Sequence, residues 1–299
     1  KLRDMFHLLK QCGERLEGYL AELDGKSADV RELAARFTID VIGLCAFGVE
    51  ANAITDQESI FRKMGKRVFE TDLKATLRFQ LRMFAPKLAH FLGKWLVDEE
   101  VQQFFINLTR DTMEYRDNNG IARHDFLDQL RDLKKAQSGS LELSEALLVS
   151  QLFVFFAAGF ETSSSTISNC LLELAMNHEI RDRLRKEIRE TLETTKGEIT
   201  YDAIHRMKYL DQCFKETLRK YPPLPTLMRE STAPYKFPGT ELTIPAGVQV
   251  WIPIFGIHHD PKYFPEPEVF DPDRFTDEAV KSRSAMTFLA FGDGPRNCI

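Results

Sequence analysis

The sequence predicts a mainly α-helical fold, with a large helical body, a small β element and a cysteine-bearing loop at the C-terminal end. Apolar residues recur at helical spacing from residue 1 to about residue 228, and proline and glycine become frequent after Arg229. With 299 residues, 43% of them hydrophobic and 28% charged, the chain is long enough to bury a large core. We therefore expect one folded domain over residues 1–299.

The helical part is interrupted by polar loops, such as residues 116–120 and 137–140. Its longest predicted helix begins after Ser144, a candidate N-cap, and continues to about Asn177. At roughly 1.5 Å per residue such a helix crosses a whole domain. Polar residues, among them Glu161, interrupt its apolar surface, so we expect a core helix and not a membrane span.

The β element is predicted from two short segments, residues 242–244 and 248–252, which lie between turn-forming residues. Pro253 confines the second segment to a sheet edge or a strand end. The prolines that recur in residues 260–275 exclude a regular helix and indicate an ordered coil. We expect the adjacent His258 and His259 to lie on a strand, where neighbours point to opposite faces, so we assign them no metal or catalytic role.

Charge and cysteine content exclude several classes of protein. A net charge of −5 argues against a nucleic-acid-binding face, because phosphate binding needs clustered Lys and Arg in excess. The five cysteines are widely spaced and form no C-x-x-C pair, so we expect neither a disulfide framework nor a structural zinc site, and we favour a reducing compartment.

The chain begins at Lys1 and stops one residue after Cys298, so we expect an internal piece of a longer protein, truncated at both ends.

Residues 291–298, Phe-Gly-Asp-Gly-Pro-Arg-Asn-Cys, form the segment with the most specific chemistry. Two glycines and a proline can bend the backbone so that its N–H groups approach the sulfur of Cys298, and such hydrogen bonds tune a metal-bound thiolate. A lone cysteine in a tight turn is more often a small buried hydrophobe. The surrounding octapeptide favours the metal-binding interpretation.

This octapeptide resembles the haem-binding signature of the cytochrome P-450 family, Phe-x-x-Gly-x-Arg-x-Cys, at every defined position from Phe291 to Cys298. The resemblance implies that Cys298 is the axial thiolate ligand to the iron of haem b. Arg296 is suited to pair with a haem propionate through charge-assisted hydrogen bonds. Arg229, by its position relative to Arg219, resembles a second propionate-binding arginine of the family, although a single Arg is usually surface charge.

Ala158, Gly159 and Thr162 share one face of the long helix. Gly159 weakens a helix by about 1 kcal/mol relative to Ala, a cost that is understandable if the backbone must deform or admit a diatomic molecule there. The alternative is a core helix whose hydroxyls bond back to the preceding turn. The segment resembles the family's oxygen-activation motif, which implies that Ala158 and Gly159 lie beside the haem, that Thr162 helps to deliver protons and that Glu161 feeds this relay.

Glu216 and Arg219 lie three residues apart on another predicted helix, and periodicity alone places them on its polar face as an exposed pair. Glu216-Thr217-Leu218-Arg219 resembles the family's Glu-x-x-Arg motif, and residues 267–275 resemble its Pro-x-x-Phe-x-Pro-x-Arg-Phe motif. The resemblance implies that Arg274 joins Glu216 and Arg219 in a buried network with a structural role.

Basic residues alternate with apolar and aromatic ones between Phe69 and Leu96. Such stretches are more often amphipathic helices packed on a core, but they can also lie on a membrane surface. In the family this region resembles the mobile lid over the substrate pocket, which touches the bilayer in microsomal members. Both interpretations stay open from the sequence.

The motifs together are most similar to the insect microsomal members of family six, which oxidise xenobiotics, so residues 1–299 are expected to be a single cytochrome P-450 catalytic domain. The implied reaction inserts one oxygen atom of O2 into an apolar organic substrate. The implied partners are NADPH-cytochrome P-450 reductase, with cytochrome b5 as a further candidate, a lipophilic small molecule and a membrane surface, at the cytosolic face of the endoplasmic reticulum. The alternatives are a haem-thiolate isomerase or dehydratase, against which Glu161 and Thr162 argue, and a non-catalytic truncated haem-binding protein.

Overall fold

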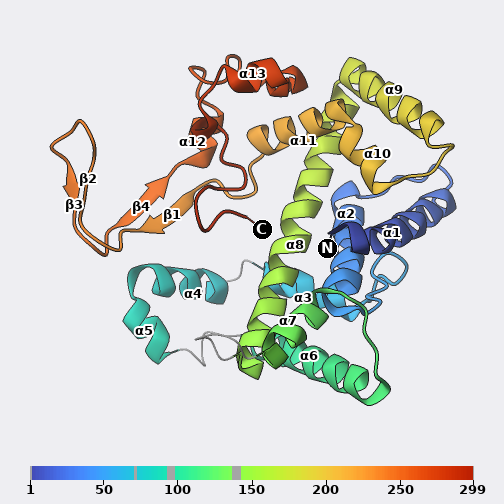
Figure 1. Ribbon diagram of the computed structural model, residues 1–299, viewed down its shortest axis with the longest axis horizontal. Helices are drawn as coiled ribbons and strands as arrows, with labels where there is room; N and C mark the ends of the chain where they lie inside the picture. Colours follow the sequence, from blue (N-terminus) through green and yellow to red (C-terminus); the bar gives the residue numbers. More distant parts are fainter. Residues whose placement is uncertain (1, 71–72, 93–97, 137–142, 299) are drawn as a thin grey trace. The chain divides into compact units, whose positions relative to one another are not determined.

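The computed structural model describes residues 2–70, 73–92, 98–136 and 143–298 (Figure 1). Within them the chain is mainly α-helical with short strands, which confirms the predicted fold class. The chain divides into two compact units, Lys1–Ser164 and Ser165–Ile299. A single catalytic domain over residues 1–299 stays a prediction.

The first unit is helical in its described part. It contains α1 (Leu2–Glu22), α2 (Val30–Ile42), the π-helical turn η1 (Gly43–Phe47), α3 (Ile60–Val68), α4 (Leu73–Phe84), α5 (Pro86–Phe91), α6 (Glu99–Asn119), α7 (Phe126–Ala136) and the first part of α8 (Glu145–Met176). Its core is rich in phenylalanine, and the rings of Phe47, Phe105, Phe156 and Phe160 are completely or almost completely buried. Capping carboxylates fix two helix starts, because Asp29 accepts the N–H of Arg31 at 2.9 Å and Asp98 caps α6 in the same way.

The second unit combines the rest of α8 with short elements. Its helices are α9 (His178–Thr194), α10 (Tyr201–Arg206), α11 (Lys208–Lys220), α12 (Ile254–His258) and α13 (Asp277–Lys281), with 3-10 turns η3 (Pro272–Phe275) and η4 (Ala285–Thr287). Strand β1 (Leu227–Glu230) pairs antiparallel with β4 (Gln249–Ile252), and β2 (Tyr235–Lys236) pairs with β3 (Thr243–Ile244). Pro253 follows the last residue of β4, where it removes no ladder hydrogen bond, as predicted.

The long helix α8 agrees with the sequence prediction at both ends. The hydroxyl of Ser144 accepts the N–H of Leu147 at 3.3 Å, so Ser144 is the N-cap. Among the described helices, α8 has the length and apolar composition that a membrane span requires, a test that the core helix of a soluble protein also passes. The prediction that its polar residues make α8 too polar for a membrane span was therefore wrong by composition alone.

Two predictions of local structure were wrong, and a third cannot be compared. The polar run 116–120 is not a loop, because α6 continues to Asn119 and ends at Gly120 in the left-handed conformation. Arg116 can stay in the helix because its guanidinium, 2% exposed, donates to Asp125 and to Asp128. His258 and His259 lie at the end of helix α12 and not on a strand. The loop predicted at 137–140 lies outside the described residues.

Candidate functional site

The cysteine loop follows η4 and is closed by its own backbone. The Cys298 N–H donates to the Phe291 carbonyl at 2.8 Å, and the Gly292 N–H donates to the Leu289 carbonyl at 2.9 Å. Gly292 and Gly294 have φ of +72° and +80°, a conformation that costs little only for glycine. The Cys298 side chain is exposed, unlike that of a structural cysteine in a core. The loop therefore presents one thiol outward from a closed turn.

Two arginines lie at or near this loop. Arg229, on β1, donates from Nη2 to the carbonyl oxygen of Asp293 at 3.2 Å, although 64 residues separate them in sequence. Its Nη2 is also 3.7 Å from the position that a Cβ would take at Gly292. Arg296 is exposed two residues before Cys298. Two guanidinium groups and one exposed thiol thus belong to the same loop and its neighbouring strand.

Glu216 and Arg219 form a completely buried ion pair on α11. The Arg219 guanidinium donates from Nε and Nη2 to the two carboxylate oxygens, at 2.7 and 2.8 Å. It also donates to the carbonyl oxygens of His258 at 3.0 Å and Pro267 at 2.7 Å. Burial raises the pKa of Glu216, and the Arg219 charge opposes that rise. The pair therefore fastens the coil of residues 259–271 to α11, and it is not the surface pair that periodicity alone predicted.

Arg274 joins the same network from the coil. Its Nε lies 3.6 Å from the Glu216 carboxylate, and its Nη2 donates to the Glu266 carbonyl at 3.0 Å. The Asp271 N–H donates to Glu216 at 3.0 Å. Arg283 is a further member of this network that was not predicted: it donates to the Arg274 carbonyl at 2.7 Å and lies over the Phe264 ring, 4.7 Å from its centroid. No motif marks Arg283, so no signal in the sequence could have found it.

The candidate relay residues on α8 have identifiable partners in the first unit. The Thr162 hydroxyl donates to the Ala158 carbonyl at 2.6 Å, which is the back-bonding that the sequence analysis named as its alternative. The Glu161 carboxylate accepts from Arg31 of α2 at 2.8 Å, with Glu161 27% and Arg31 67% exposed. An ion pair this exposed contributes about 0 to 1 kcal/mol, so it can open at little cost.

Gly159 has a packing reason that the sequence did not show. A Cβ at Gly159 would lie 2.5 Å from Cδ1 of Ile42, so the glycine allows α2 to approach α8 closely. The Thr38 hydroxyl of α2 also donates to the Phe160 carbonyl, at 3.1 Å. Close contact with α2 is therefore sufficient to explain Gly159, and its place beside a cofactor stays a prediction.

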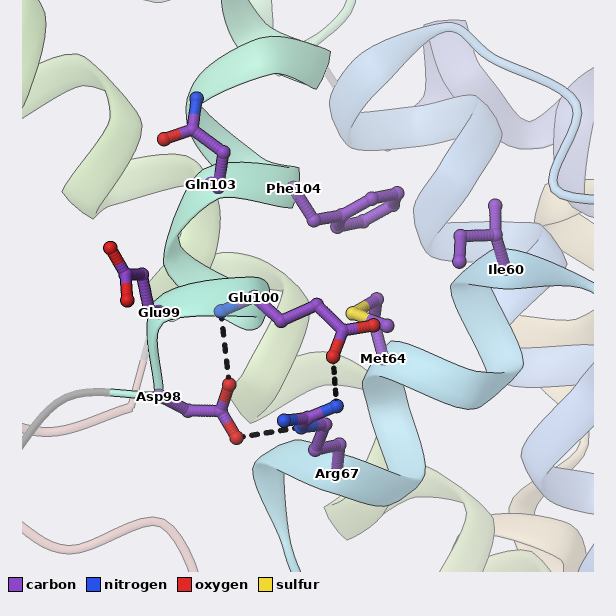
Figure 2. A pocket seen from close by; sticks show the side chains of 8 residues that line it. All are labelled: Ile60, Met64, Arg67, Asp98, Glu99, Glu100, Gln103 and Phe104. Atoms are coloured by element: carbon purple, nitrogen blue, oxygen red, sulfur yellow. Dashed lines mark hydrogen bonds and ion pairs between the residues drawn. The ribbon is translucent and has the colours of Figure 1, made fainter.

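An open pocket between α3 and α6 contains none of the predicted site residues (Figure 2). Arg67, in the last turn of α3, donates to the α6 cap Asp98 at 2.7 Å and pairs with Glu100. Met64 and Phe104 form apolar walls of this pocket. Because Arg67 and Asp98 flank residues 69–97, the ion pair joins the two ends of the stretch in which basic and apolar residues alternate.

The comparisons with known proteins identify the family. The family model for cytochrome P450 matches residues 1–299, so the chain belongs to the cytochrome P-450 family. Probable cytochrome P-450 6a14 of Drosophila melanogaster is 42% identical over 316 residues, which cover all of this chain and 62% of that protein. Cytochrome P-450 6A1 of Musca domestica is 42% identical over 310 residues, which cover all of this chain and 60% of that protein. Cytochrome P-450 6k1 of Blattella germanica is 38% identical over 319 residues, with all of this chain and 61% of that protein covered.

These relatives confirm the predicted similarity to insect members of family six. The chain spans about three fifths of the length of the relatives that it matches. The family uses haem with a cysteine thiolate on the iron. The residues described above fit this group, because the loop offers one exposed thiol and two arginines suited to carboxylates.

Proposed function

We propose that this protein is a haem-thiolate monooxygenase, which inserts one oxygen atom of O2 into apolar organic molecules with electrons from NADPH. The observation that carries the proposal is the exposed Cys298 at the end of a closed, glycine-bent loop that Arg229 contacts. Bound haem supplies the activation of O2, which a thiolate ligand favours. Cys298 would hold the iron, and Arg229 and Arg296 would hold the propionates.

The partners in this proposal are NADPH-cytochrome P-450 reductase, with cytochrome b5 as a further electron donor, and a lipophilic substrate. Turnover in a reconstituted system tests it: product should form with reductase and NADPH, and should not form when the reductase is left out. An isomerase or dehydratase would turn over without the reductase. Turnover independent of the reductase would therefore favour that alternative.

We predict that Thr162→Ala keeps haem and substrate binding but diverts reducing equivalents to hydrogen peroxide. The hydroxyl now donates to the Ala158 carbonyl at 2.6 Å, and it would have to turn from that acceptor to pass a proton. General acid–base assistance is worth about a hundredfold in rate, so the yield of product per NADPH should fall strongly. The measurement is the ratio of product formed to NADPH consumed.

Ser163→Ala is the matched control, because Ser163 is exposed and follows Thr162 on the same helix. Its ratio should equal that of the parent protein. An unchanged ratio in Thr162→Ala would mean that the hydroxyl only packs against its own helix and that protons arrive by another route.

We also propose that α4 and α5 contact a membrane surface, at the cytosolic face of the endoplasmic reticulum. Large apolar side chains on these two helices are exposed, among them Phe84 at 82% and Phe91 at 84%. Lys87, between them, is exposed as well, and lysines next to apolar residues favour anionic lipid surfaces. Lys94 and Trp95 of the same stretch lie outside the described residues.

Replacing both Phe84 and Phe91 with serine should weaken binding to phosphatidylcholine–phosphatidylserine vesicles by at least about tenfold, because burying a Phe side chain contributes about 1.5 to 3 kcal/mol. Sedimentation with vesicles measures it. The control is Leu133→Ser on α7, which removes a 62% exposed apolar side chain elsewhere in the first unit. Equal binding by the double variant and the parent protein would contradict membrane contact by α4 and α5.

A further inference from the structure

His258, the last residue of α12, is a completely buried histidine for which the proposed reaction has no use. Its imidazole lies against the Phe288 ring, with ring centroids 5.3 Å apart and planes inclined by 14°. The edge of Phe264 closes another side, with a centroid distance of 6.3 Å. The histidine is thus packed between aromatic rings, one of which, Phe288, lies just before the cysteine loop in the sequence.

One ring nitrogen of His258 makes a specific hydrogen bond to the chain that enters the loop. The N–H of Leu289 donates to Nε2 at 2.9 Å, so Nε2 carries no proton. Burial lowers the pKa of His258 to about 4, which keeps the ring neutral and Nε2 an acceptor at physiological pH. The proton then resides on Nδ1, which is buried and makes no hydrogen bond of normal geometry with the described residues, although backbone groups of Leu218 and Arg219 lie near enough to oppose the effect of burial on the pKa.

Filling space alone does not explain a histidine at position 258. A phenylalanine would fill a similar volume and stack on Phe288 without bringing a ring N–H into the core. The feature that phenylalanine lacks is the acceptor at Nε2. The contact that needs an explanation is therefore the hydrogen bond from Leu289.

His258 connects the buried ion pair to the cysteine loop through two of its groups, the backbone carbonyl and the imidazole ring. Its carbonyl oxygen accepts from Arg219 at 3.0 Å, and Arg219 is held by Glu216. Its ring fixes the Leu289 N–H, and the Leu289 carbonyl accepts from Gly292 at 2.9 Å, which begins the loop. The loop then closes through Cys298 and Phe291.

We propose that His258 is a positioning residue for Cys298: its neutral imidazole fixes the start of the cysteine loop and so sets where the thiol stands when haem is bound. This inference rests on the proposed function for its consequence at the iron. Its structural part, the hold on Leu289, stands on the contacts of the second unit alone.

The test compares three variants of the haem-loaded protein. His258→Phe keeps the stacking and removes the acceptor, His258→Gln restores an acceptor near the position of Nε2, and His259→Gln changes the neighbouring histidine, which stacks on Phe255. Hydrogen–deuterium exchange of the peptide that contains Leu289 should become about tenfold faster in His258→Phe, as expected when one backbone hydrogen bond is lost. His258→Gln should recover most of the protection, and His259→Gln should leave it unchanged.

The second readout is the reduced, CO-bound spectrum. His258→Phe should convert a larger share of the protein from the thiolate form to the neutral-thiol form at equal haem content, and His258→Gln should reverse this. Unchanged exchange at Leu289 in His258→Phe overturns the inference, and so does faster exchange with an unchanged spectrum. A parent protein without a thiolate band would overturn the proposed function instead.

Discussion

A Cys298→Ser protein is expected to lose completely the red-shifted Soret band of its reduced, CO-bound form. That band requires a thiolate on the iron, and a serine hydroxyl stays protonated at neutral pH and donates far less electron density. The loop itself should survive the change, because its closing bond uses the backbone N–H of residue 298 and not the sulfur. The measurement is the CO difference spectrum at equal protein concentration.

Cys170→Ser is the matched control for this substitution. Cys170 lies on α8, is half-buried, and has a thiol pKa that burial raises, so it is a poor metal ligand. Its variant should keep the thiolate band. A thiolate band that persists in Cys298→Ser would show that another residue binds the iron and would overturn the assignment of Cys298.

In Glu216→Ala the second unit should unfold at a much lower denaturant concentration than in the parent protein. The free energy of unfolding should fall by about 3 to 5 kcal/mol. The carboxylate is completely buried, accepts hydrogen bonds from Arg219 and from the Asp271 N–H, and forms an ion pair with Arg274 at 3.6 Å. Removing it leaves guanidinium charges buried without a counter-ion. The measurement is urea unfolding followed by circular dichroism, together with haem content.

Two further variants separate burial of the pair from a general effect of losing a glutamate. Glu190→Ala removes an exposed carboxylate 3.9 Å from Lys186 on α9 and should change stability by at most about 1 kcal/mol. Glu216→Leu combined with Arg219→Met removes both charges and should cost less than Glu216→Ala alone, since no unpaired Arg219 remains. Normal stability and haem content in Glu216→Ala would show that the network does not hold the coil.

The sequence identified the cysteine loop and the two buried motifs only by resemblance, because the packing that buries them involves distant residues. Periodicity placed Glu216 and Arg219 on the polar face of α11, which is correct for an isolated helix. The coil around Pro267 covers that face, so the pair is buried in the folded chain. The loop predicted at Arg116 was wrong for the same reason. A polar residue near a helix end indicates a loop, but in the folded chain Asp125 pairs with Arg116 and the helix continues.

Local signals alone determined the start and length of α8, the strand that ends before Pro253 and the coil of residues 260–271. They also determined that the backbone can bend at the glycines before Cys298, because each of these features depends on neighbours a few residues away. Tertiary structure alone decided that Gly159 faces Ile42, that Arg229 reaches Asp293 and that His258 holds Leu289. The two residues in each of these contacts are separated by between 31 and 117 positions in the sequence. No periodicity within one element can specify them, because they depend on which surfaces pack together when the chain buries its apolar side chains.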